Sequence, residues 1–194
     1  MRSSALLVPA GLALFVAGVL LWQIPATDLA LHRALLFHAG GPWVAPMIWF
    51  TALGGFLVMG PVALVAAALL VWRGERPRAL WLVTTIAIGR LIVEGMKLLV
   101  ERPRPPQADR LEFVTSWSFP SSHSAGTMMT TAALVLLAGG RWPAWLAMML
   151  ATGAIGWSRV ALGVHWPSDV LAGWGFGLAW TGAAWRYGGP MRSG

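Results

Sequence analysis

Long apolar runs separated by short polar segments dominate the chain. Six of these runs reach the length of about 20 residues that a helix needs to cross the hydrocarbon core of a bilayer. They cover residues 5–22, 42–72, 79–100, 122–138, 142–162 and 167–185. The pattern predicts an all-α integral membrane protein with six transmembrane helices in one bundle, and residues 1–194 as a single membrane-embedded domain.

The second run is too long for one uninterrupted span. It is broken by prolines and glycines at Pro42, Pro46, Gly54, Gly55, Gly60 and Pro61. We therefore expect a short interfacial piece followed by the true span. Residues 23–41, between the first two runs, carry Asp28, His32, Arg33 and His38. Residues 29–37 there are a candidate for a short interfacial helix lying at the membrane surface.

The composition agrees with a membrane protein. Hydrophobic residues make up 57% of the 194 residues and charged residues only 11%, whereas a soluble domain carries about 25% charged residues. The apolar N-terminus resembles a signal peptide but lacks a convincing cleavage site, so we interpret it as a retained span. The absence of cysteine excludes disulfides and thiolate metal sites. Seven tryptophans near span ends fit an aromatic belt: Trp22, Trp43, Trp72, Trp117, Trp142, Trp166 and Trp185.

The net charge of +7 is better explained by topology and anionic lipid than by nucleic acid, because the basic residues lie in short loops between apolar runs. An even number of spans places both termini on one side. With the termini inside, the inner segments carry Arg2, Arg73, Arg76, Arg78, Arg141, Arg186 and Arg192, and the outer segments Arg33, Lys97, Arg102, Arg104, Arg110 and Arg159. If Lys97, Arg104 and Arg159 serve a site, the positive-inside rule favours cytoplasmic termini.

Three polar clusters fall on the same outer face in this topology. The first, KLLVERPRP, places Lys97, Arg102 and Arg104 at the end of the third span. Basic residues there suit the helix dipole and lipid head groups in any membrane protein. A guanidinium held by neighbouring prolines, with an ammonium close by, also suits an anion with several oxygens.

The second cluster, FPSSHSAG, places Ser121, Ser122 and His123 at the start of the fourth span. A serine in this position caps many helices. A helix N-terminus also offers amides to a phosphate, and a histidine beside it can exchange a proton near neutral pH.

The third cluster, WSRVALGVHWPSDVL, is the most specific of the three. Arg159, His165 and Asp169 lie in an otherwise apolar segment, where ionisable groups are costly and usually functional. Asp169, in the first turn after Pro167, can bind one ring nitrogen of His165 and leave the other free to attack. A purely structural His–Asp pair is the alternative.

Two further charges lie inside the third span. Arg90 and Glu94 are four residues apart and share a helical face, with Lys97 three residues further on. We expect Arg90 and Glu94 to pair with each other or to line a wet cavity. The functional alternative is a polar floor beneath a site, or support for Lys97.

Together the clusters resemble the type 2 phosphatidic acid phosphatase family, which shares its site with vanadium haloperoxidases and some bacterial acid phosphatases. Its three motifs occur in order: K-x6-R-P from Lys97 to Pro105, P-S-G-H from Pro120 to His123, and S-R-x5-H-x3-D from Ser158 to Asp169. Ser122 stands where the family often has glycine. This adds a hydroxyl and restricts the backbone.

The resemblance implies that His165 is the nucleophile, that Asp169 orients it, and that His123 protonates the leaving oxygen and then activates water. Lys97, Arg104 and Arg159, with Ser121, Ser122 or neighbouring amides, would hold the phosphoryl oxygens. Three fixed cations can supply the charge that a metal supplies elsewhere, so we expect no metal and no cofactor.

The expected function is removal of phosphate from a membrane lipid at the outer face, in a bacterial inner membrane, by a site that faces the periplasm or exterior. Undecaprenyl pyrophosphate is the favoured substrate, with phosphatidic acid or phosphatidylglycerol phosphate as alternatives. Transfer of the phosphoryl group to another lipid would use the same residues. An anion or lipid transporter and a catalytically inactive lipid-binding relative are the non-enzymatic alternatives, and the apolar faces leave the oligomeric state open.

Overall fold

The computed structural model of the chain describes residues 5–190, and each regular element among them is a helix. Arg2 and Arg192, which the topology prediction counts, lie outside the described residues. The elements are α2 (Leu7–Trp22), α3 (Pro25–Leu35), α4 (Val44–Ala52), α5 (Phe56–Trp72), α6 (Arg76–Val100), the 3-10 helix η1 (Gln107–Asp109), α7 (Ser122–Leu137), α8 (Trp142–Ala161) and α9 (Pro167–Gly188).

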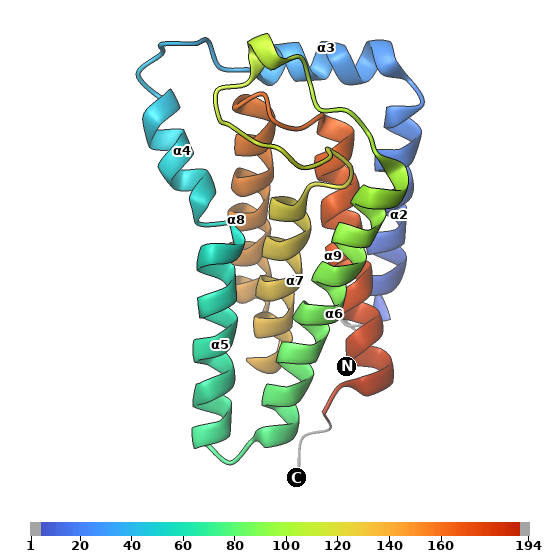
Figure 1. Cartoon of the computed structure of the whole chain (residues 1–194). Helices are drawn as coiled ribbons and strands as arrows, with labels where there is room; N and C mark the ends of the chain where they lie inside the picture. The colour runs from blue at the N-terminus through green and yellow to red at the C-terminus, as the bar shows by residue number, and fades with distance from the viewer. Residues whose placement is uncertain (1–4, 191–194) are drawn as a thin grey trace.

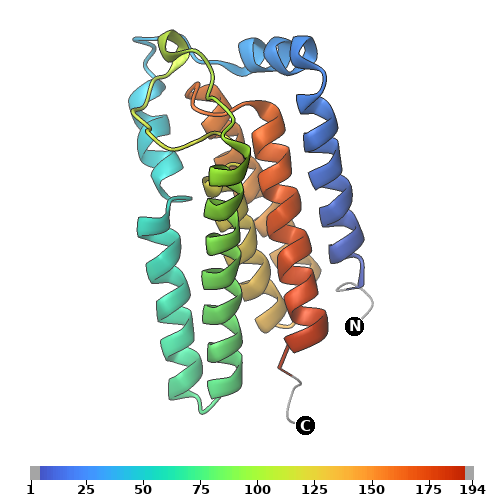
Figure 2. The same cartoon turned by 45° about the vertical axis from the view of Figure 1, so that its right-hand side comes forward.

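The longer helices run side by side in one bundle, and α3 lies across one of its ends (Figure 1, Figure 2). The long loop between α6 and α7 and the connection between α8 and α9 lie at this same end, which we call the α3 end. The α5–α6 and α7–α8 turns, the start of α2 and the end of α9 lie at the opposite end (Figure 1). The path of the chain through the bundle therefore places the three polar clusters at the α3 end.

Not every predicted span passes a test of length and hydropathy. Within residues 5–190, Val44–Trp72, counted through the turn between α4 and α5, and Arg76–Val100 pass alone, and α2 passes only together with α3. Helices α2 and α7 have 16 residues each. Most residues of α7 are buried by neighbouring helices, so they can be small or polar without contacting lipid. The count of six spans stays a prediction.

A short helix before the second run and a break within that run both occur, although α3 begins and ends earlier than residues 29–37 and the interfacial position of both pieces stays a prediction. Helix α3 follows α2 after a bend of 101°, and the second run breaks at residues 53–55 between α4 and α5. The polar side chains of α3 differ from those of a simple surface helix, because Asp28 and His32 are fully buried against the bundle. Pro61 remains inside α5.

The aromatic belt is only partly as expected. Trp43, Trp72 and Trp142 are largely exposed at helix ends, as a belt requires. Trp22 instead packs on Phe119, with ring centroids 5.3 Å apart. Others that pack inward are Trp166, beside His32, and Trp185, beside Trp81.

Small residues place α9 in the centre of the bundle. A Cβ added at Gly175 or Gly18 would lie closer than 3.0 Å to backbone atoms across the α2–α9 contact, and one at Gly173 or Gly177 would lie equally close to the backbone of α7. Close backbone approach through small residues is a common way for helices to associate in membranes. It holds the start of α9, and with it Asp169, inside the protein.

Candidate active site

A cavity of about 220 Å³ lies where the three polar clusters meet. Its lining includes Arg104 from the α6–α7 loop, His123 from the first turn of α7, Arg159 from the end of α8 and His165 from the α8–α9 connection. The remaining lining residues are Gly54, Phe56, Arg90, Glu94, Val114, Ser116 and Ser122. Two histidines and several cations thus face one space.

His165 is positioned by the turn that precedes it and by the helix that follows. Gly163 adopts a positive φ of 71°, which lets the chain reverse after α8. Asp169 then caps α9, since its Oδ2 accepts from the backbone N–H of Trp166 at 3.0 Å. The same oxygen lies 3.4 Å from Nδ1 of His165, as the short sequence spacing predicts.

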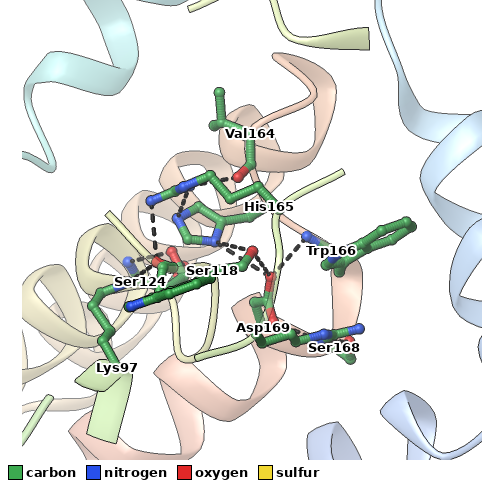
Figure 3. A network of polar contacts seen from close by, with 12 residues as sticks. Lys97, Ser118, Ser124, Val164, His165, Trp166, Ser168 and Asp169 are labelled. Atoms are coloured by element: carbon green, nitrogen blue, oxygen red, sulfur yellow. Dashed lines mark hydrogen bonds and ion pairs between the residues drawn. The ribbon is translucent and has the colours of Figure 1, made fainter. Parts of the chain in front are cut away.

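Ser118 is a third member of this group that the motifs did not indicate. Its Oγ donates to Oδ2 of Asp169 at 2.5 Å and lies 3.4 Å from Nδ1 of His165 (Figure 3). Ser118 and Asp169 together occupy the Nδ1 side of the imidazole. The other nitrogen, Nε2, lies on the side of Arg104, whose Nη1 is 3.1 Å away.

The electrostatic surroundings keep His165 neutral. Burial, and the positive charges of Arg104, Lys97 and Arg159, hold the pKa of His165 well below its usual value of 6.5. A neutral imidazole with Nδ1 beside a carboxylate retains a lone pair on Nε2. The ring therefore has the protonation state that a nitrogen nucleophile requires.

Arg104 is held in a fixed direction by its own loop. Its Nε donates to the carbonyl of Ser116 at 2.6 Å, and its Nη1 donates to the carbonyl of Val164 at 2.5 Å. Burial and the neighbouring Arg159 charge lower the pKa of Arg104 to about 10, so the guanidinium is still cationic at pH 7. A fixed, planar cation beside Nε2 suits phosphoryl oxygens.

Arg159 is almost wholly buried and only partly satisfied. Its Nη1 donates to Thr51 at 3.1 Å and to Glu112 at 2.6 Å. Its Nε is buried without a hydrogen-bond partner among the described residues. Buried donors in native proteins are nearly always paired, so this N–H is an exception in a residue that lines the cavity.

The start of α7 supplies His123 and Ser122 to the cavity but not the Ser121 side chain. Ser121 is fully buried and caps the helix, with its Oγ accepting from the N–H of Ser124 at 3.4 Å. Ser122 lines the cavity and donates to Oε1 of Glu94 at 2.9 Å. The hydroxyl that replaces the usual glycine therefore has an acidic partner on α6.

Lys97 is near the site but does not line the cavity. Its Nζ donates to the carbonyl of Trp117 at 2.6 Å, and the side chain is buried. Its charge still acts on His165, because it contributes to the lowered pKa of that imidazole. The roles that the family resemblance implies for Lys97 and for the other site residues stay predictions.

Arg102, which belongs to the first polar cluster and to which the motifs assign no role, is buried between two carboxylates. Its Nη1 donates to Oδ1 of Asp169 at 2.5 Å, and its Nη2 donates to Oδ2 of Asp28 at 2.8 Å. The guanidinium lies between the rings of Trp22 and Trp166, at 4.9 and 5.6 Å from their centroids. Helix α3 therefore supports Asp169 through Arg102. The one signal in the sequence is Asp28, an acidic residue next to an apolar span that needs a cationic partner if it is buried.

The mutual pairing of Arg90 and Glu94 is not seen. The ion pairs among residues 5–190 include neither side chain. Glu94 instead accepts from Ser122, and the Arg90 guanidinium lies 4.8 Å from the centroid of the Phe56 ring. Both line the cavity, which is the second of the two expected arrangements, and their role as a polar floor beneath the site stays a prediction.

Comparison with known proteins decides the family. Residues 78–191 match the family model of the PAP2 superfamily, a segment that contains all three motifs. The chain belongs to the PAP2 superfamily. This confirms the resemblance to type 2 phosphatidic acid phosphatases.

Relatives of this PAP2 protein are named as lipid phosphatases. It is 31% identical over 115 residues to an undecaprenyl-diphosphatase from Sulfolobus acidocaldarius, a match that covers 57% of this chain but only 55% of that protein. It is 34% identical over 139 residues to the putative undecaprenyl-diphosphatase YbjG of Escherichia coli, covering 68% of this chain and 67% of YbjG.

A solved structure shares the fold of this PAP2 protein. The crystal structure of a transmembrane PAP2 type phosphatidylglycerolphosphate phosphatase from Bacillus subtilis superposes with a TM-score of 0.78 at 25% identity, over 92% of this chain and 95% of that one. The likeness and the apolar helices support an integral membrane protein.

Proposed function

We propose that this PAP2 protein removes a phosphoryl group from a lipid phosphate or diphosphate through a phosphohistidine formed on His165. The observation that carries the proposal is the geometry of one imidazole. Its Nδ1 side is occupied by Asp169 and Ser118, its Nε2 side lies at a cavity with cationic walls, and its lowered pKa keeps it neutral.

The proposed reaction has two displacements at phosphorus. In the first, the lone pair on Nε2 of His165 attacks, the P–N bond forms, and the P–O bond to the leaving group breaks while His123 donates a proton to the leaving oxygen. In the second, His123 takes a proton from water, whose oxygen attacks phosphorus and releases His165 with inorganic phosphate. Asp169 stabilises the positive charge that develops on the ring.

Fixed cations supply the charge stabilisation that phosphoryl transfer needs. In the proposed reaction Arg104 and Arg159, which line the cavity, hold the equatorial oxygens, and the buried Lys97 adds positive potential. Within residues 5–190, no three His, Asp or Glu side chains are grouped so that they could hold a metal ion. These arginines can supply the charge stabilisation without a metal ion, and backbone amides at the start of α7, among them that of Ser122, are further donors in the proposed reaction.

Undecaprenyl diphosphate is the favoured substrate, because the two relatives described above are named undecaprenyl-diphosphatases. Phosphatidylglycerol phosphate is the main alternative substrate, because the similar Bacillus subtilis structure is named a phosphatidylglycerolphosphate phosphatase. Phosphatidic acid is a further alternative. Transfer of the phosphoryl group to a second lipid differs only in the acceptor that replaces water.

The test uses protein purified in detergent and measures phosphate release from prenyl diphosphate, phosphatidic acid and phosphatidylglycerol phosphate, with and without EDTA. We expect release from at least one lipid to persist in EDTA and to fall about 10⁴-fold or more in His165→Ala. His38→Ala, which removes an exposed histidine, is the matched control and should keep full activity. Absence of release from all lipids would favour an anion transporter or an inactive lipid-binding relative, and loss of activity in EDTA would contradict the metal-free mechanism.

We also propose that both termini are cytoplasmic and that the cavity faces the periplasm or exterior. The natural chain has no cysteine, so single cysteines report location without background. A cysteine at Gln107, at the α3 end, should react with an impermeant maleimide in intact cells, and one at Gly74, in the opposite turn, should react only after the inner membrane is opened. The reverse pattern would overturn the orientation.

A further inference from the structure

Arg90 is a cation in the cavity wall that the proposed mechanism does not use. It lies seven residues before Lys97 on α6, roughly 10 Å deeper along the helix at 1.5 Å per residue. It nevertheless lines the same cavity as His123 and His165. The cavity therefore reaches from the cations at the α3 end down to a further guanidinium within the span.

The surroundings of Arg90 hold the guanidinium in place without forming an ion pair with it. It lies over the Phe56 ring, and a Cβ added at Gly126 would collide with its Nη1. No described carboxylate forms an ion pair with it. A charged side chain at this depth is costly unless it faces a cavity and serves a ligand.

The order of residues along the cavity places Arg90 on the leaving-group side of the reaction. His165 and Arg104 lie in the connections at the α3 end, and His123 lies in the first turn of α7. Gly126, which Arg90 contacts, is three residues further along α7 on the same face as His123. Beyond the proton donor for the leaving oxygen, the next charged group is therefore Arg90.

The proposed pose of a lipid substrate runs in the same direction. Its transferred phosphoryl group contacts His165, and its tail leaves the cavity past Arg90. In this pose the part of the lipid between the scissile bond and the tail passes His123 and lies near Arg90. In a phosphate monoester that part is a neutral alkyl or glyceryl group, whereas in a diphosphate it is a second, anionic phosphate.

We propose that Arg90 binds the second phosphate of a lipid diphosphate and makes this protein prefer diphosphates to phosphate monoesters. The proposal rests on the lipid phosphatase function proposed above. Arg90 would neutralise the charge that grows on the departing phosphate as the P–O bond breaks, while His123 supplies the proton. The preference would thus appear in kcat/KM.

Glu94 sets the limit of this subsite. It lies one turn closer to the α3 end than Arg90, and it lines the cavity while accepting from Ser122 at 2.9 Å. The bond to Ser122 holds its carboxylate at the start of α7, away from Arg90. A carboxylate in the wall repels an anionic leaving group, so removing its charge should favour the diphosphate further.

Farnesyl diphosphate and farnesyl phosphate test the proposal, since they share one tail and differ by one phosphate. The measurement is kcat/KM for each in detergent, expressed as a ratio of diphosphate to monophosphate. Arg90→Met, which keeps the length of the side chain, should lower this ratio about ten- to hundredfold, the loss expected for a hydrogen bond between charged groups. Arg141→Met, the same change at an exposed site at the opposite end, should leave the ratio unaltered.

Glu94→Gln is the second variant, because it keeps an acceptor for Ser122 and should fold even if Arg90→Met does not. We expect it to raise the ratio severalfold. An unchanged ratio in Arg90→Met, or an equal loss of both activities, would overturn the role of Arg90 and leave the phosphatase function standing. So would an unchanged or lowered ratio in Glu94→Gln. If the natural protein cleaves neither compound nor any other lipid phosphate, the proposed function itself fails and the inference fails with it.

Discussion

Arg102 offers the sharpest test of how the fold supports His165, the proposed nucleophile. Its guanidinium is the shared partner of Asp28 and Asp169, and all three side chains are at most 7% exposed. Arg102→Met keeps the length of the side chain and its contact with the tryptophan rings but leaves two buried carboxylates without their cation. Removing one partner of a buried ion pair costs about 3–5 kcal/mol.

That loss should be visible in both stability and activity. For a protein of this size, each kcal/mol shifts the unfolding midpoint by about 2–4 °C, so the shift should be about 6–20 °C. Asp169 would also lose the bond that directs its second oxygen to His165, and a misplacement of about 1 Å can lower kcat/KM about 100-fold. The stability and activity of Arg102→Lys should lie between those of the natural protein and those of Arg102→Met, because an ammonium cannot make both bonds in the same planar geometry.

The assay compares thermal unfolding in detergent at one scan rate with phosphate release from the best lipid substrate. Arg33→Met, an exposed arginine on α3, is the matched control and should alter neither quantity. If Arg102→Met unfolds within about 2 °C of the natural protein and keeps its kcat/KM within twofold, Arg102 does not support Asp169 and the reasoning is refuted.

Two further predictions follow from the site and the packing. Because its pKa is held well below 6.5 by burial and nearby cations, His165 should stay neutral as the pH falls to 6.5 and protonate only in more acidic solution. An NMR titration of labelled histidines, with His165→Ala to assign the resonance, checks this, and a midpoint at or above 6.5 would contradict it. Gly175→Ala should destabilise the protein by about 1–3 kcal/mol because the new Cβ meets the backbone of α2, whereas Gly95→Ala, with open space around it, should be neutral or stabilising by up to about 1 kcal/mol. Equal unfolding midpoints for the two glycine variants would refute the packing argument.

Much of the site could be predicted because motif spacing is local. His165 lies two residues before α9 begins and Asp169 lies in the first turn of that helix, so their proximity follows from the chain itself. The break between α4 and α5 follows from prolines and glycines in the same way. Hydropathy along the chain likewise indicated that His123, Arg104 and Arg159 would meet at one end of the bundle.

Other features required the packed helices. Arg102 and Asp28 are 74 residues apart, and their pairing depends on α3 folding back over the start of α9. Arg90 and Glu94 share a helical face, yet Ser122 and Phe56 on neighbouring elements take them as partners instead. Lys97 donates a hydrogen bond to the backbone carbonyl of Trp117 in the α6–α7 loop, and no sequence pattern predicts this partner.

The sequence by itself thus determined which segments are helical, where they break and which motifs they carry, because apolar periodicity and the backbone limits of proline and glycine act over a few residues. Only the tertiary structure decided which polar atoms face one another. A side chain reaches only a few ångströms beyond its backbone, so its partner depends on which helix faces meet and how closely. In this protein, glycines that bring α9 against α2 and α7 set that approach.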